Sequence, residues 1–322
     1  MKEKLKQKAR ALPLSPGVYL MKDRHGDIVY IGKAKKLKER VSSYFIKNSQ
    51  HSSKVKRMIL QLADFDVIHV DTELDALLLE CRLIQQHRPM YNRQMNAFER
   101  YSFLTILNEK QKIRLATAPF PTGTYTFGPY TSHRQLPEIT AILEKLYHLN
   151  PNDSWHRLFA QTTESTIDSD LILTELLAAF TGHPEALEKR LEQKMIAASE
   201  NLHFIQAAQW RDDWQLIHRF FHRHAQLLLS PINQQEWHAL WLPIENGGKC
   251  YLIYQGLVLA EHYFPNIPLA DTKQLLHAAE KLLPEQPETI HTYSKNQIDF
   301  IYILHMYLQR NTAYQLIPIK NS

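Results

Sequence analysis

Two short apolar strands separated by one turn, near the N-terminus, narrow the possible folds of this chain more than any other feature. An entry turn at residues 15–17 (Ser-Pro-Gly) leads into a strand at residues 18–21. Residues 24–27 have turn chemistry, and residues 28–31 form the returning strand. Gly32 closes that strand and lets the backbone bend closely into the next segment. The pattern predicts a small sheet with flanking helices.

The segment that follows, residues 33–45, has a helical period. One face carries an apolar stripe for packing, made of Ala34, Leu37 and Val41. Another face carries polar groups three or four residues apart, namely Lys33, Lys36, Arg40 and Tyr44. Beside one tyrosine on each strand, Tyr19 and Tyr30, this row of donors is what binding of a phosphodiester requires. The alternative is a surface helix whose lysine side chains extend into solvent.

Charge is concentrated in the same region. Residues 1–62 contain sixteen Lys and Arg against four Asp and Glu, a local charge of +12. The whole chain carries +5, so the remaining residues carry −7. Such segregation indicates a binding face for a polyanion. A solvated basic face is the alternative.

A second predicted helix places a carboxylate among apolar residues. Thr72 can cap the helix, with Asp75 in the capping-box position, and Pro89 stops it. The neighbours of Glu80 at three and four residues are all apolar: Ala76, Leu77, Leu83 and Ile84. Glu80 therefore needs a partner outside its helix, either a cation, a metal or a substrate contact, or a distant Lys or Arg.

These residues occur in the order and spacing of a known nuclease domain. Gly17-Val18-Tyr19, residues 29–34 (Val-Tyr-Ile-Gly-Lys-Ala), Arg40, Glu80 and residues 89–92 (Pro-Met-Tyr-Asn) resemble the GIY-YIG domain. The resemblance is strongest to the UvrC-type excision-repair endonucleases, including the small UvrC-like enzymes of the Cho type. Val18 stands where the motif has its first isoleucine, a change that leaves the strand intact.

The resemblance implies cleavage of phosphodiesters with one divalent metal, magnesium or manganese. Glu80 matches the metal ligand, an oxygen donor that suits a hard cation. Tyr19 and Tyr30 match the tyrosine pair, one of which helps to deprotonate the attacking water; the sequence leaves open which one. Because a free tyrosine has a pKa near ~10, a cation such as Lys33 or the metal has to lower it.

The resemblance also assigns residues to the phosphate. Arg40 matches the arginine that contacts the scissile phosphate, Lys33 and Tyr44 match supporting positions, and Asn92 matches a carboxamide that orders the site. Further DNA contacts are expected from the basic residues Lys35, Lys36, Lys38, Lys54, Lys56 and Arg57.

Cysteine usage argues against a cluster of iron and sulfur. Residues 127–132 resemble a UvrC-type block that precedes a helix, here at residues 137–148, and full-length relatives then carry a cysteine cluster. Residues 148–182 contain no cysteine, so no iron–sulfur cluster is expected. Cys81 and Cys250 are too far apart to form a metal-binding pair and suit a reducing compartment. With no long apolar run and no secretory signal, we expect a cytoplasmic protein without a membrane span.

A helical hairpin is predicted at residues 187–221, and its residues 195–212 resemble the UVR motif, which docks to UvrB in relatives. The expected contact residues are Leu202, Phe204, Ala207, Ala208 and Arg211. The alternative is that the hairpin packs on its own chain.

The C-terminal region predicts a small mixed domain. Strands are expected at residues 237–242, 250–254 and 257–264, and helices at residues 271–283 and 297–310. It is too short for the second, RNase H-like nuclease domain of full-length relatives. His222, His224, His262 and His277 show no metal-ligand spacing with acidic neighbours.

The predicted fold is therefore α+β in four parts: a GIY-YIG nuclease domain at residues 1–104, a middle region at 105–184, a UVR-like hairpin at 185–228 and a mixed C-terminal domain at 229–322. The predicted function is a nuclease that nicks damaged DNA on the 3′ side of the lesion during nucleotide excision repair. The alternatives are a nuclease for branched or mobile DNA, and a non-catalytic adaptor that binds DNA and UvrB.

Overall fold

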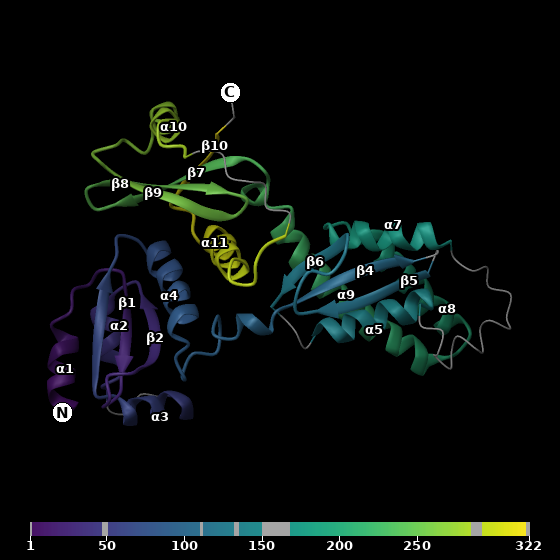
Figure 1. Ribbon diagram of the computed structural model, residues 1–322, viewed down its shortest axis with the longest axis horizontal. Helices are drawn as coiled ribbons and strands as arrows, with labels where there is room; N and C mark the ends of the chain where they lie inside the picture. Colours follow the sequence, from purple (N-terminus) through teal and green to yellow (C-terminus); the bar gives the residue numbers. More distant parts are fainter. Residues whose placement is uncertain are drawn as a thin grey trace. The chain divides into compact units, whose positions relative to one another are not determined.

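The computed structural model forms two compact units (Figure 1). Unit 1 combines Met1–Phe98, Gln234–Thr289 and Asn296–Ser322, and unit 2 combines Glu99–Asn233 and Ile290–Lys295. The described residues are 2–46, 51–109, 112–131, 135–149, 168–284 and 292–319. Within these ranges, no helix combines the length and the apolar character that crossing a membrane requires.

The N-terminal part of unit 1 is a three-stranded antiparallel sheet between helices, in the order β2-β1-β3. Its elements are α1 (Lys2–Arg10), β1 (Gly17–Lys22), β2 (Ile28–Ala34), α2 (Leu37–Ser43), α3 (Ser53–Gln61), β3 (Asp64–His69) and α4 (Glu73–His87). Side chains of β1 alternate between two cores, because successive residues of a strand point to opposite faces. Tyr19 and Met21 join the core with α1, α2 and α3, whereas Val18 and Leu20 pack toward α4. The predicted small sheet with flanking helices is confirmed.

The predicted start of the basic helix at Lys33 is wrong. Strand β2 continues to Ala34, with Lys33 paired to Val18 of β1, and α2 begins only at Leu37. Lys33 therefore does not share a helical stripe with Arg40. The strand extends because the backbone of residue 33 finds hydrogen-bond partners far away in the sequence, which local periodicity does not reveal.

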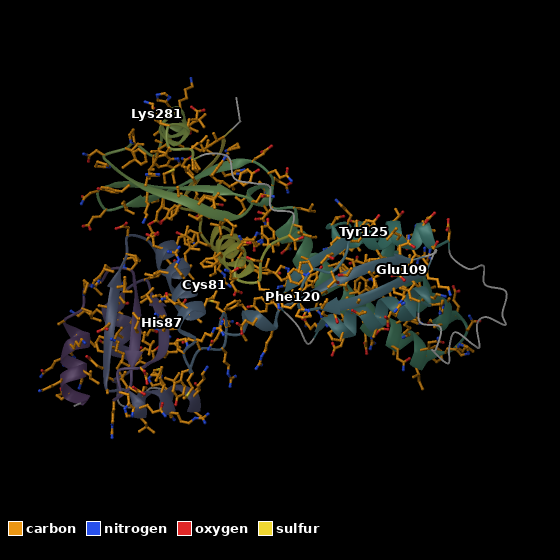
Figure 2. All side chains as sticks on the ribbon, viewed as in Figure 1. Cys81, His87, Glu109, Phe120, Tyr125 and Lys281 are labelled. Carbon is orange, nitrogen blue, oxygen red and sulfur yellow. The ribbon has the colours of Figure 1, made fainter. Side chains whose placement is uncertain are left out.

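The C-terminal part of unit 1 is a four-stranded antiparallel sheet in the order β10-β7-β8-β9. Its elements are β7 (Trp237–Ile244), β8 (Gly247–Tyr254), β9 (Leu257–Pro265), α10 (Thr272–Glu280), α11 (Ile298–Arg310) and β10 (Gln315–Ile319). The three strands and two helices expected here are confirmed, while β10 was not predicted. Helix α11 packs against α4, where Gln85 Nε2 donates to Asp299 Oδ2 at 3.2 Å. Cys81 on α4 (Figure 2) and Cys250 on β8 are both free and buried.

Asp75 joins the two parts of unit 1. The predicted capping box is confirmed: Thr72 Oγ1 accepts from the Asp75 backbone N–H, and Asp75 Oδ2 accepts from the Thr72 backbone N–H, both at 3.0 Å. The same carboxylate accepts from Lys249 Nζ at 2.9 Å and from the Tyr251 hydroxyl at 2.8 Å, both on β8. An aspartate at a position that usually holds Glu or Gln thus caps α4 and also pairs with a buried lysine.

Replacing Lys249 by methionine is expected to lower the free energy of unfolding by about 3 kcal/mol, because it leaves the buried Asp75 carboxylate without its countercharge. The side chains of Lys249 and Asp75 are only 8% and 7% exposed. Urea unfolding measures the loss, with the exposed Lys273→Met on α10 as the control. Equal stability of the two variants would contradict the structural role of this ion pair.

Unit 2 is built around a second antiparallel sheet, in the order β5-β4-β6. Its elements are β4 (Ser102–Glu109), β5 (Lys112–Ala118), β6 (Tyr125–Tyr130), α5 (Gln135–Tyr147), α7 (Ser169–Phe180), α8 (Glu185–Glu200) and α9 (Phe204–Leu228). Short 3-10 turns lie at Pro231–Asn233 and at Phe98–Arg100, where unit 1 passes into unit 2. Helices α8 and α9 form the predicted hairpin. One face of α9, including Trp210, Ile217 and Phe221, is buried in the same core as the sheet.

Candidate active site

The free edge of β2 is covered by a carboxamide. Asn92 Oδ1 accepts from the Ile31 backbone N–H, and Asn92 Nδ2 donates to the Ile31 carbonyl, both at 2.9 Å. The neighbouring Tyr91 N–H donates to the Val29 carbonyl at 2.9 Å. Because β1 lies on the other side of β2, these bonds occupy the edge that would otherwise present unpaired backbone groups. Asn92 thus holds β2 in place beside the tyrosines.

Glu80 continues this row of edge contacts from α4. Its Oε1 accepts from the Lys33 backbone N–H at 3.0 Å, two residues beyond Ile31 on the same edge. Glu80 therefore has a partner outside its helix, but this partner is a backbone N–H, a kind of group that was not expected from the sequence. Burial raises the pKa of the Glu80 carboxyl, against smaller lowering effects of the Lys33 hydrogen bond and the charges of Lys33 and Arg40. The carboxylate is half-buried and poorly solvated.

Three tyrosines and an arginine form a cluster on the side of the sheet that packs against α1, α2 and α3. The hydroxyls of Tyr19 and Tyr44 share a hydrogen bond of 2.8 Å, and Arg40 Nε donates to the Tyr19 hydroxyl at 3.3 Å. The Arg40 guanidinium lies 5.2 Å from the centre of the Tyr44 ring. The rings of Tyr19 and Tyr30 are 6.1 Å apart between centres. Tyr19 is completely buried, whereas Tyr30 is partly exposed.

Gly32 makes room for this cluster. A Cβ added at residue 32 would overlap the phenol group of Tyr19. From the sequence, Gly32 was expected to close the strand and to let the backbone bend. The structure shows a different reason for the glycine, which is the close approach of the Tyr19 ring to the backbone of β2.

Burial dominates the acidity of the tyrosines. It raises the pKa of Tyr19 well above its usual value, with further raising by Tyr44 and Tyr30. For Tyr30, burial followed by the charges of Tyr44 and Glu80 raises the pKa to about 12. The expectation that Lys33 lowers a tyrosine pKa is wrong; the cation that does so for both groups is Arg40.

The side chain of Lys33 is instead paired with Glu73, a residue that the sequence reasoning missed. Lys33 Nζ and Lys35 Nζ each lie 2.7 Å from a carboxylate oxygen of Glu73, at the first turn of α4. Burial raises the pKa of Glu73, but the hydrogen bonds from the two lysines prevail and the net shift is downward. An acidic residue directly after the capping Thr72 was the available signal, since carboxylates favour helix N-termini.

A pocket of 530 Å³ opens beside the cluster, lined by Lys33, Ala34, Lys35, Lys36, Glu39, Arg40 and Ser43. Three of these residues, Lys35, Lys36 and Arg40, are exposed cationic groups. Lys36 lies 3.0 Å from Glu39. The structure thus brings together the predicted phosphate-binding residues Lys33, Lys35, Lys36 and Arg40 around one opening.

The other predicted DNA contacts lie on neighbouring helices. Lys38 on α2 is exposed, and so are Lys56 and Arg57 on α3. Lys54 is half-buried, and burial together with the charge of Arg93 lowers its pKa. These positions remain predictions.

The predicted partner-binding residues lie in unit 2, at the turn of the hairpin. Leu202 and Phe204 are 72% and 64% exposed, and Ile205, which was not singled out from the sequence, is 82% exposed. The remaining predicted positions are Ala207 and Ala208, which are half-buried, and Arg211, which is exposed and 2.8 Å from Asp212. The hairpin therefore buries one face in its own chain and leaves an apolar tip, made of Leu202, Phe204 and Ile205.

Comparison with known proteins locates the similarity in this chain. Residues 15–93 match the family model described as the UvrC-like GIY-YIG domain. Over 223 residues, the chain is 39% identical to UvrABC system protein C of Desulfitobacterium hafniense (strain Y51), which covers 65% of this chain and 36% of that protein. It is 33% identical to UvrABC system protein C of Ligilactobacillus salivarius (strain UCC118), which covers 65% of this chain and 37% of that protein. The chain thus spans little more than a third of the length of these curated relatives.

A solved structure also matches part of this chain. It is the GIY-YIG N-terminal endonuclease domain of UvrC from Thermotoga maritima, bound to its catalytic divalent cation, magnesium. The sequence identity is 42%, and the match covers 29% of this chain and 100% of that chain, with a TM-score of 0.27.

Proposed function

We propose that the UvrC-like GIY-YIG domain at residues 15–93 makes this chain a metal-dependent endodeoxyribonuclease that nicks damaged DNA in nucleotide excision repair. We propose further that it is of the small Cho type and cuts on the 3′ side of the lesion. The observation that carries the proposal is that β2 connects two groups inside the segment that matches the family. Glu80 accepts from the backbone of β2 at Lys33, and Tyr30 of β2 contacts the ring of Tyr19, whose hydroxyl accepts from Arg40.

The residues at this site fit a divalent cation. Glu80 is a half-buried carboxylate whose raised pKa reflects poor solvation, so a hard cation such as magnesium or manganese would restore the lost charge stabilisation. Its Oε1 is oriented by the Lys33 backbone N–H, which fixes the carboxylate in place. When bound, the cation supplies charge stabilisation to a phosphate oxygen and the leaving group.

Tyr30 is the better candidate for the general base. Its phenol is partly exposed to solvent, and the charge of Glu80 contributes to its raised pKa, so Tyr30 lies within the electrostatic field of the proposed metal ligand. Tyr19 is completely buried, and its hydroxyl is already bonded to Tyr44 and Arg40. Tyr19 therefore positions Arg40 rather than moving a proton.

Arg40 is the candidate for binding the scissile phosphate. Its exposed side chain lines the pocket and is oriented through Nε by Tyr19, and a guanidinium in this position can make a bidentate contact with a phosphate. Lys35 and Lys36 border the same opening and can hold the flanking phosphates. Lys33 acts through Glu73, which keeps its side chain at the mouth of the pocket.

The partners follow from the same proposal. DNA would lie on the basic face of unit 1, and UvrB would dock on the apolar tip of the hairpin. An exposed cluster of Leu202, Phe204 and Ile205 is suited to a partner helix pair, because burying it removes a large apolar surface from water.

Cleavage of an end-labelled duplex with one bulky lesion tests the function. The full chain would be assayed with magnesium or manganese, with and without UvrA and UvrB. A single nick on the 3′ side that the partners strengthen is the expected result. Cutting of branched DNA as efficient as that of damaged DNA, without partners, would instead indicate a nuclease for branched or mobile DNA. No cleavage under any condition would indicate a non-catalytic adaptor that binds DNA and UvrB.

Replacing Phe204 by aspartate is expected to weaken binding to UvrB by about 100-fold, because apolar residues at the centre of an interface carry most of its binding energy. Phe204 is 64% exposed, so the fold of the hairpin should survive. Phe120→Asp, at a residue of unit 2 that is 69% exposed (Figure 2), is the matched control. Equal affinity of both variants in a titration with labelled UvrB would show that the tip is not the docking site.

A further inference from the structure

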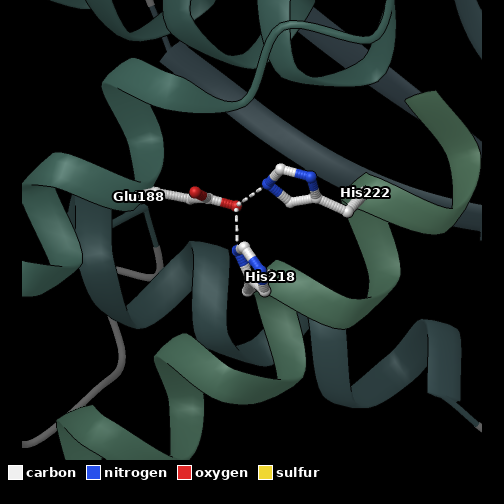
Figure 3. A group of neighbouring side chains, drawn as sticks. All are labelled: Glu188, His218 and His222. Atoms are coloured by element: carbon white, nitrogen blue, oxygen red, sulfur yellow. Dashed lines mark hydrogen bonds and ion pairs between the residues drawn. The ribbon is translucent and has the colours of Figure 1, made fainter. Parts of the chain in front are cut away.

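Two histidines and a glutamate meet on the hairpin of unit 2, where no metal ligands were expected from the sequence. His218 and His222 lie one turn apart on α9, and Glu188 faces them from α8 (Figure 3). Glu188 Oε1 is 3.1 Å from His218 Nδ1 and 3.3 Å from His222 Nε2. The three atoms all lie within 4.8 Å of one another. From this arrangement we propose that the hairpin holds a zinc ion between Glu188, His218 and His222.

The spacing of the three atoms fits tetrahedral coordination. Zinc bonds to histidine nitrogen and carboxylate oxygen are about 2.0–2.1 Å long, which places neighbouring ligand atoms about 3.3 Å apart. The two distances from Glu188 Oε1 match this separation. All three ligand atoms lie within 4.8 Å of one another, and the two imidazole ring centres are 4.0 Å apart, so one ion can contact both rings and the carboxylate.

The donor set selects the kind of cation. Two imidazole nitrogens and one carboxylate oxygen favour zinc over magnesium or calcium, which prefer ligands that are all oxygen. The side chains of His218 and His222 are 39% and 50% exposed, so water can complete the coordination from the outer side. Trp214 stacks on the His218 ring, with centres 4.7 Å apart, and fixes its orientation.

The position in the hairpin indicates what the ion does. Glu188 is thirteen residues before the turn at Asn201, which corresponds to about 20 Å along the helix. The ion therefore links α8 to α9 far from the exposed tip. It stabilises the hairpin because its coordination bonds add to the packing between the two helices. This role needs no part of the nuclease site in unit 1.

Zinc titration of the full chain tests the site, after treatment with a chelator and in a Glu80→Gln background that removes the proposed ligand in unit 1. We expect about one zinc ion per chain, bound at least roughly 100-fold more weakly by His222→Gln and by Glu188→Gln, because even outer partners of a ligand change metal affinity by 10–100-fold. His203→Gln, at an exposed histidine in the hairpin turn, is the matched control and should bind like the parent.

Two further readouts separate ligation from folding. Zinc at a hundredfold excess over its dissociation constant for the parent should raise Tm by about 5 °C in the parent and by no more than about 1 °C in His222→Gln. Cobalt(II) should give the absorption bands of a four-coordinate site in the parent alone. Equal zinc affinity in the parent, His222→Gln and Glu188→Gln would overturn the proposal and leave hydrogen bonds between Glu188 and the histidines. This result would not touch the nuclease proposal, since the titration uses a variant without Glu80.

Discussion

Replacing Glu80 by glutamine is expected to lower the rate of DNA cleavage by about 10³-fold or more and, at the same time, to stabilise the metal-free protein at neutral pH. The loss of rate follows because several kcal/mol of transition-state stabilisation depend on a cation that this carboxylate would hold, and about 1.4 kcal/mol corresponds to tenfold in rate. The gain in stability follows because a neutral carboxamide avoids the cost of a poorly solvated charge, while its oxygen can still accept from the Lys33 N–H.

The gain in stability from Glu80→Gln should depend on pH, in a direction that the pKa shift of Glu80 determines. Because the pKa of Glu80 is raised in the folded protein, its contribution to stability is fully present below the pKa of the unfolded chain and is lost as the pH rises through the folded pKa. The Tm difference between Glu80→Gln and wild type should therefore be absent at low pH and grow toward neutral pH. Thermal unfolding in a chelator measures it, with exposed Glu280→Gln as the control. Magnesium should then raise the Tm of wild type only.

Two outcomes would contradict this prediction. Full cleavage by Glu80→Gln would show that the carboxylate takes no part in the reaction and that another group holds the metal. A variant less stable than wild type at neutral pH would mean that the charged form of Glu80 is stabilised by its surroundings, opposite to the direction of the pKa shift.

Replacing Tyr30 by phenylalanine is expected to lower the cleavage rate by about 10²–10⁴-fold, the usual contribution of a general base, with little change in stability. The ring and its packing remain, and only the hydroxyl is lost. Because the pKa of Tyr30 is raised to about 12, the phenolate is scarce at neutral pH. The rate of the wild type should therefore rise about tenfold per pH unit from neutral pH upward. The rise should end at the pKa that Tyr30 has in the metal-bound protein.

Tyr19→Phe is the comparison that identifies the base. It removes the hydroxyl that bonds Tyr44 and Arg40, so it should lower the rate through a misplaced Arg40 and keep the rise with pH. Single-turnover rates across pH separate the two roles. A flat pH profile in Tyr19→Phe, with the rise retained in Tyr30→Phe, would assign the base to Tyr19.

Local patterns in the sequence were sufficient for the elements and for the residue types of the site. Short apolar runs at residues 18–21 and 28–31, separated by turn residues, predicted the hairpin of β1 and β2, and the capping residues around Thr72 predicted the start of α4. The isolation of Glu80 among apolar neighbours predicted a partner outside the helix, since a buried carboxylate cannot stay unpaired. Each of these predictions used only residues that are close together in the sequence.

Only the tertiary structure decided which groups meet. Lys33 extends β2 because its backbone N–H bonds Glu80, 47 residues further along the chain, and its side chain bonds Glu73. Strand β10 forms by pairing with β7, from Ile319 with Trp237 to Gln315 with Trp241, a register that no local period encodes. Periodicity tells which face of an element is buried, but the partner on that face depends on how distant segments pack. The joining of Glu188 with His218 and His222 was invisible in the sequence for the same reason.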